Sequence, residues 1–162
     1  MMFEPQRMAL VAEAESWLRT PHHHQGRRKG AYDLPNPEDR GGVDCLMFVA
    51  ESFANCGFID RLPDIEYAQD EHLHRGDEVV LEWMERYSHP INRQQLLPAD
   101  IIIYKYGRRF SHGAIALPPG WPRIIHAVQD RCVEYGRADQ VSSRGHRPSA
   151  MAFYRLNAWR ED

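Results

Sequence analysis

The order of the apolar patterns is the feature that most constrains the fold of this chain. In three segments before about residue 86, apolar residues recur every three or four positions, which is the spacing of amphipathic helices. After Pro98 they form short β-branched runs with a period of two. The turns between these runs are too short for crossover helices, so neighbouring strands are expected to pair antiparallel. The pattern therefore predicts an α+β domain, with helices packed on one side of an antiparallel sheet.

The expected elements follow from this periodicity and from its breakers. Helices are expected over residues 4–19, 43–55 and about 77–86. Strands are expected over residues 100–106, 112–117, 123–128, 132–135 and 151–156. Pro21 ends the first helix, because the residue before a proline is displaced from helical geometry. A loop is expected from Pro21 to Gly42, and Gly57 lies where a left-handed cap would end the second helix.

The composition fits one soluble domain over residues 1–162. Of the 162 residues, 43% are hydrophobic and 27% are charged, and the formal net charge is −3. This near balance argues against nucleic acid as a partner, because nucleic-acid-binding domains usually carry an excess of basic residues. No apolar run reaches membrane-spanning length, so no membrane partner is expected. The N-terminal segment also lacks the pattern of a signal peptide, which predicts synthesis in the cytoplasm without one.

Cys45 is the candidate nucleophile among the cysteines. The chain has 3 cysteines, and an odd number cannot pair completely within one chain, so free thiols are expected. Cys45 follows a Gly-Gly loop and begins the second expected helix, where the partial positive charge of the helix N-terminus favours a thiolate. The alternative at this position is a buried packing cysteine, and that is the expectation for Cys56 and Cys132.

Two histidines are the candidate partners of this thiol. His112 and His126 lie in expected strands among small or apolar neighbours, whereas the remaining histidines lie in polar segments. Alternate residues of a strand share a face, so Ala114 and Ala116 would leave room beside the imidazole of His112. A nucleophile, a base and an orienting group in this order favour covalent catalysis over two core histidines. No metal site is expected at His22–His24, because adjacent residues point in different directions and no further ligand completes a zinc spacing.

Five segments resemble, in order, the NlpC family of cell-wall cysteine peptidases, and in particular its phage and prophage tail-associated branch. They are SWLRTPHHHQGRRKG, VDCLMFV, LLPADIIIY, FSHGAIAL and IIHA. In that family the second segment carries the nucleophile at a helix start, the fourth carries the base and the fifth carries a third polar residue. The resemblance implies a papain-like fold and a catalytic triad of Cys45, His112 and His126.

The resemblance also implies a substrate and a setting. The expected reaction is hydrolysis of peptidoglycan stem peptides beside D-glutamate, through a thioester on Cys45 and without a cofactor or metal. Asp44 would bind the free amine of the stem peptide, although an Asp before a helix is equally expected as an N-cap. Phage tail proteins are the implied partners, and the implied location is a virion whose enzyme acts at the cell wall.

The sequence departs from the family at three positions near the expected site. His22 stands where the family usually has tyrosine, and Leu46 and Met47 stand where it often has Ser-Gly. His22 is therefore expected to line a substrate-binding site that differs from the usual one. Two alternatives stay open: an amidase or acyltransferase of the same fold, and a structural tail component with an inactive site. The basic segment Arg27–Lys29 is expected either to face an anionic polymer or to be a solvated loop.

Overall fold

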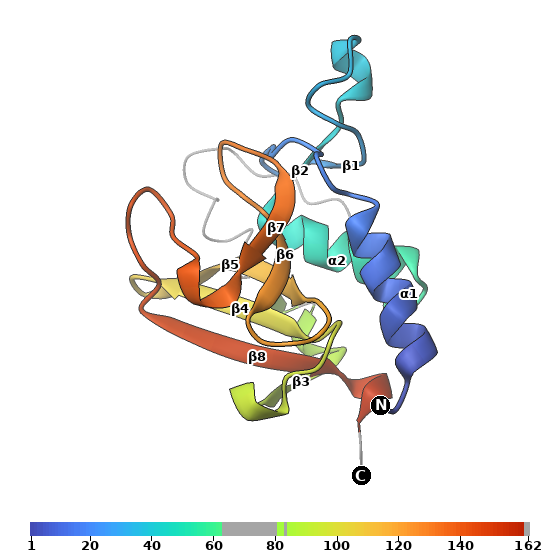
Figure 1. Ribbon diagram of the computed structural model, residues 1–162, viewed down its shortest axis with the longest axis vertical. Coiled ribbons are helices and arrows are strands. Elements are labelled where there is room, and N and C mark those ends of the chain that lie inside the picture. Colours follow the sequence, from blue (N-terminus) through green and yellow to red (C-terminus); the bar gives the residue numbers. More distant parts are fainter. Residues whose placement is uncertain (63–80, 83, 161–162) are drawn as a thin grey trace.

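The structure is a computed structural model that describes residues 1–62, 81–82 and 84–160. Its centre is a six-stranded antiparallel sheet in the order β3-β8-β4-β5-β6-β7. The strands are β3 (Ser88–Ile91), β4 (Ile101–Tyr106), β5 (Arg109–Ala116), β6 (Arg123–Ala127), β7 (Val133–Arg137) and β8 (Ala150–Leu156). Helices α1 (Glu4–Glu15) and α2 (Cys45–Asn55) lie next to each other on one side of this sheet (Figure 1). The expected α+β class is confirmed, and α1 and α2 both precede the six strands of this sheet.

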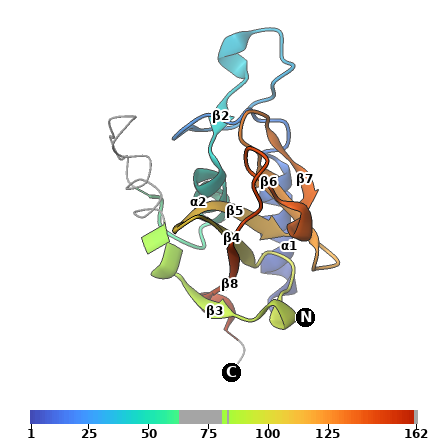
Figure 2. The ribbon, with the colours of Figure 1, turned by 90° about the vertical axis from the view of Figure 1, so that its left-hand side faces the viewer.

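The sheet has an apolar core on each face. Successive residues of its central strands point to opposite faces, and the residues on both faces are apolar. One face contributes Ile103 and Ile115 to the core that packs against α1 and α2. The other face contributes Ile102 and Ala114 to a second core, which residue Val141 helps to cover. Figure 1 shows β6 and β7 running across the direction of β8, and Figure 2 shows β3 and the β6–β7 pair at opposite ends of the sheet.

A buried ion network joins α1 to the sheet. The carboxylate of Asp100 accepts hydrogen bonds from Arg7 at 2.9 Å, from Arg155 at 2.8 Å and from the N–H of Leu97 at 2.9 Å. The side chains of Arg7 and Asp100 have no exposed surface. Charges at this depth are tolerated only when they are paired, so the network fixes the position of α1 against the start of β4.

The first helix is shorter than its periodicity suggests. It ends at Glu15 rather than at residue 19. The N–H groups of Trp17 and Leu18 bond to carbonyls three residues back, so the last turn tightens and the α-helical pattern stops. The chain then passes through Arg19 at φ 74°, a left-handed conformation that no helix continues.

The loop expected over residues 21–42 contains a small sheet. Strand β1 (Arg27–Arg28) pairs antiparallel with β2 (Gly42–Val43). Because Val43 belongs to β2, the second helix begins at Cys45 and not at residue 43. It ends as expected, since Gly57 adopts φ 76° just after the helix.

Strand β3 was not expected from the sequence. It contains Pro90, and it lies at the edge of the sheet, where a proline removes no bond from the ladder. Of the helix expected over residues 77–86, the positions 81, 82, 84 and 85 are helical, while 77–80 and 83 lie outside the described residues. Within the part of the chain that is described, no helix combines the length and the apolar composition needed to cross a membrane.

The basic segment Arg27–Lys29 holds the loop against the helices. The Nε of Arg27 donates to the buried carboxylate of Glu51 in α2 at 2.5 Å. The ammonium of Lys29 lies 2.8 Å from the carboxylate of Glu13 in α1. Both cations are therefore held by intramolecular ion pairs, and neither side chain lines the pocket described below.

Candidate active site

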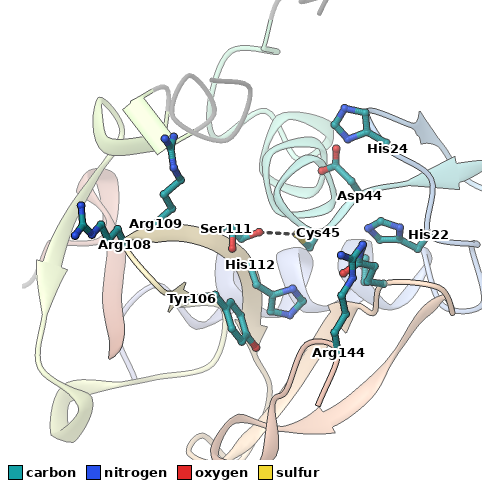
Figure 3. Close-up of a pocket in the computed structure, with 12 residues that line it drawn as sticks. His22, His24, Asp44, Cys45, Tyr106, Arg108, Arg109, Ser111, His112 and Arg144 are labelled. Atoms are coloured by element: carbon teal, nitrogen blue, oxygen red, sulfur yellow. Dashed lines mark hydrogen bonds between the residues drawn. The ribbon is translucent and has the colours of Figure 1, made fainter. Parts of the chain in front are cut away.

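A pocket of about 490 Å³ lies where the start of α2 meets the β4–β5 hairpin. A volume of this size is typical of sites that bind small ligands or a few residues of a peptide. Its lining residues are His22, His24, Asp44, Cys45, Tyr106, Arg108, Arg109, Ser111, His112, Ala127, Gln129 and Arg144. Figure 3 shows that the expected nucleophile and the expected base face this same space.

Asp44 positions the thiol by capping the helix that carries it. Its Oδ1 accepts the N–H of Met47 at 2.8 Å, and its Oδ2 accepts the N–H of Gln25 at 2.8 Å. Asp44 is therefore the N-cap of α2, and Cys45 is the first residue of that helix. Burial raises the pKa of Asp44, and the two N–H donors oppose that rise.

The thiol of Cys45 lies against the strand that carries the imidazole. Its Sγ donates a hydrogen bond to the backbone carbonyl of Ser111 at 3.2 Å, and Ser111 directly precedes His112 in β5 (Figure 3). Gly113 permits this close approach, because a Cβ at that position would lie only 3.2 Å from two side chains of α2. A larger residue there would push the helix start, and the thiol with it, away from β5.

His112 and His126 form a hydrogen-bonded pair. The Nε2 of His112 lies 2.9 Å from the Nδ1 of His126, and the two rings are nearly perpendicular at 78°. The ring of His126 is buried, and it fits only because position 136 is glycine: a Cβ on Gly136 would lie 2.8 Å from its Nε2. Since this bond uses the Nε2 of His112, the Nδ1 is the ring nitrogen left to face the thiol or a substrate.

Both rings are neutral at physiological pH. Burial, with smaller contributions from the neighbouring His126 and His22, lowers the pKa of His112 to about 3. Burial also lowers the pKa of His126 to about 4, with a smaller contribution from the charge of Arg131. A neutral imidazole next to a thiol is the protonation state that a general base requires. Burial lowers the pKa of His22 as well, against the opposing charge of Asp44.

Tyr106 faces the pocket although the sequence analysis did not place it there. Tyr104 pairs with His112 across the β4–β5 ladder, and Tyr106 lies two residues further along β4. Because alternate residues of a strand share a face, this spacing could have indicated that Tyr106 lies near His112. Its hydroxyl is buried and has no hydrogen-bond partner within the described ranges. Burial and the charge of Cys45 raise the pKa of Tyr106 to about 12, so the phenol stays protonated.

The structure thus brings all five expected site residues together. Asp44, Cys45, His22 and His112 line one pocket, and His126 stands directly behind His112. Their roles in catalysis and substrate binding stay predictions. The other two cysteines do not line the pocket. No group of three His, Cys, Asp or Glu side chains that could hold a metal ion occurs among the residues described.

The fold is of the papain-like α+β class, and the solved structures that it resembles are NlpC/p60 domains. The NlpC/p60 domain of the peptidoglycan hydrolase SagA matches with a TM-score of 0.55 and 22% identity, over 90% of this chain and 96% of that chain. The P60 domain of an antigen from M. avium subspecies paratuberculosis matches with a TM-score of 0.56 and 17% identity, over 97% of each chain.

A longer protein matches in part. An NlpC/P60 family protein from Bacillus cereus ATCC 10987 has a TM-score of 0.55 and 16% identity, and the match covers 86% of this chain but 36% of that chain. No protein-family model matches the sequence, and no curated protein matches it significantly. At these identities the likeness establishes the fold, and it confirms the papain-like architecture that the sequence motifs implied.

Proposed function

We propose that this protein is a cysteine peptidase that hydrolyses peptidoglycan stem peptides. The observation that carries the proposal is the arrangement of three side chains: Cys45 begins α2, His112 faces the same pocket, and His126 is bonded to the back of His112 at 2.9 Å. The similarity to a domain of a peptidoglycan hydrolase supports the choice of substrate.

The first half of the proposed reaction transfers the acyl group to sulfur. The thiol hydrogen of Cys45 turns from the carbonyl of Ser111 to the Nδ1 of His112, and the sulfur attacks the scissile carbonyl. The N–H of Cys45, at the helix N-terminus, donates to the developing oxyanion. The C–N bond then breaks, the leaving amine takes the proton from His112, and a thioester remains on Cys45.

The second half releases the acyl group. A water molecule gives a proton to the Nδ1 of His112 and attacks the thioester carbonyl. The C–S bond breaks, the product leaves as a carboxylic acid, and the proton returns to the Cys45 sulfur. Through both halves His126 holds the ring of His112 in one orientation, and accepting the Nε2–H of His112 fixes the tautomer in which Nδ1 is the base.

The finer features of the substrate belong to the same proposal. The cleaved bond is placed beside D-glutamate, and the free amine of the stem peptide is placed against Asp44 and His22. Each oxygen of the Asp44 carboxylate accepts one backbone N–H, from Met47 and from Gln25, so each keeps a lone pair for a substrate amine. We extend the proposal to a phage or prophage tail as carrier, with tail proteins as partners and the cell wall as the place of action.

The test is digestion of purified peptidoglycan, followed by mass analysis of the released fragments. Wild type is expected to release peptides with a new free amine, while Cys45→Ala releases none above the buffer blank. Cys56→Ala is the matched control, because it removes a thiol outside the pocket, and it should digest like wild type. Equal release by wild type and Cys45→Ala would refute the proposal. Release of ammonia, or transfer of the acyl group to an added amine, would indicate the amidase or acyltransferase alternative.

A further inference from the structure

Arg144 occupies an unfavourable backbone position next to the pocket. It lies in the connection between β7 and β8, where Ser143 and His146 exchange two backbone hydrogen bonds of 2.9 Å. The two residues between them, Arg144 and Gly145, both have positive φ, at 51° and 79°. This is the geometry of a tight hairpin turn whose first central position favours Asn, Asp or Gly. An arginine there costs free energy, and such residues are often retained for a functional reason.

The side chain of Arg144 extends from this turn into the pocket. Figure 3 shows it pointing toward the space between His112 and His22, and it is one of the lining residues. Its guanidinium has no hydrogen bond or ion pair with any of residues 1–62, 81–82 or 84–160. The strained turn therefore presents an unpaired cation to the site, where a planar anion could accept two of its N–H groups.

The remaining charges of the pocket favour an anionic ligand. Asp44 is the only carboxylate among the described lining residues, and two backbone N–H groups already bind it. Arg108 adds a further cation to the wall formed by the β4–β5 hairpin. Among the described lining residues, Arg108 and Arg144 thus outnumber the one carboxylate, although the whole chain has a net charge of −3. A local field of the opposite sign concentrates anionic substrates.

The geometry points to Arg144 as a specificity-determining residue that binds a carboxylate of the substrate peptide. This inference rests on the proposed function and adds to it a requirement for an acidic peptide. The carboxylate is either the free α-carboxylate of a γ-linked glutamate near the scissile bond or the C-terminal carboxylate of a short peptide. Both present the same planar anion, so the experiment separates them.

The experiment measures binding by calorimetry on full-length Cys45→Ala protein, which holds substrate without turnover. The ligands are the tripeptide L-Ala-γ-D-Glu-L-Lys, the same peptide amidated at the glutamate α-carboxylate, and the same peptide amidated at its C-terminus. We expect one of the two amidations to weaken binding about tenfold, as the loss of a charge-assisted hydrogen bond predicts. The amidation that weakens binding identifies the carboxylate that Arg144 holds.

Second substitutions in that background test the residue itself. Arg144→Gln is expected to bind all three peptides with the weaker affinity, whereas Arg147→Gln, on the same connection but outside the pocket, keeps the preference. Arg144→Gly should lose the preference too, while its urea midpoint stays equal or rises, because glycine relieves the positive φ. Equal affinity for the three peptides, or an affinity that Arg144→Gln leaves unchanged, would overturn this inference alone. Failure to bind any peptide would overturn it together with the proposed substrate.

Discussion

The substitution Gly136→Ala tests whether the orientation of His126 matters. An added Cβ would lie 2.8 Å from the Nε2 of His126, and ordinary contact begins at 3.4 Å, so the ring has to move by about 0.6 Å. The hydrogen bond between the Nε2 of His112 and the Nδ1 of His126 is 2.9 Å long, and donor–acceptor distances in such bonds span only about 0.5 Å. The ring cannot keep its bond to His112 and also avoid the new methyl group.

The expected loss of activity follows from that displacement. Losing one neutral hydrogen bond costs about 0.5–1.5 kcal/mol, which corresponds to a fall in kcat/KM of roughly 2- to 13-fold. A shift of the base itself, as His112 follows His126, extends the loss to about 100-fold. We therefore expect kcat/KM on a stem peptide to fall about 10- to 100-fold, with a smaller change in KM than in kcat.

The assay is steady-state cleavage together with urea unfolding of the same preparations. Arg137→Ala, at the neighbouring exposed position of β7, is the matched control and should cleave like wild type. Overpacking at position 136 lowers the free energy of unfolding by about 1–3 kcal/mol, so activity is compared where both proteins are folded. A value of kcat/KM for Gly136→Ala within twofold of wild type would refute the positioning role of His126.

Three further outcomes are expected. Asp100→Ala leaves the buried guanidinium groups of Arg7 and Arg155 without their carboxylate. The free energy of unfolding, measured by urea titration, should therefore fall by about 3–5 kcal/mol, and a loss below about 1 kcal/mol would contradict the buried network. The free energy of unfolding should also fall as the pH is lowered from 7 to 5. Histidines of the unfolded chain are protonated near pH 6.5, whereas buried His112 and His126 have pKa values of about 3 and about 4, so protons bind preferentially to the unfolded state. His126 alone lowers the free energy of unfolding by about 2 kcal/mol at pH 5, and His126→Gln should reduce the pH-dependent loss by that amount. Iodoacetamide at pH 7 should label Cys45 before Cys56 and Cys132, since burial raises the pKa of the latter two thiols; equal labelling rates, read by peptide mass mapping, would contradict an activated Cys45.

The parts of the fold that the sequence predicted are those with a clear period. The apolar stripe of α2 and the alternating runs of β4 to β8 are long enough to show their spacing, and they formed close to the expected bounds. Strands β1 and β2 have two residues each, which is too short for any period, and Pro90 made the edge strand β3 look like a loop.

The candidate site was predictable only where local context carries the chemistry. A cysteine at a helix start and histidines in apolar strands are visible in the sequence, so Cys45, His112 and His126 were found. Tyr106 shares a strand face with Tyr104, so alternation along the strand could have indicated it once the pairing of Tyr104 with His112 was known. Arg144 reaches the pocket from a turn between distant strands, which no local pattern encodes. The pairing of Arg7 with Asp100 joins residues 93 positions apart, and it likewise depends on how the finished helix docks.

The most direct test of the central claim is the mass of the enzyme during turnover. Wild-type protein is mixed with a stem peptide, quenched in acid within milliseconds, digested and analysed by mass spectrometry. We expect the fragment that contains Cys45 to gain the mass of the acyl half of the peptide, and the adduct to be absent in Cys45→Ala. Cleavage of the peptide by Cys45→Ala at the wild-type rate, with no adduct on the wild-type protein, would contradict thioester catalysis at this site.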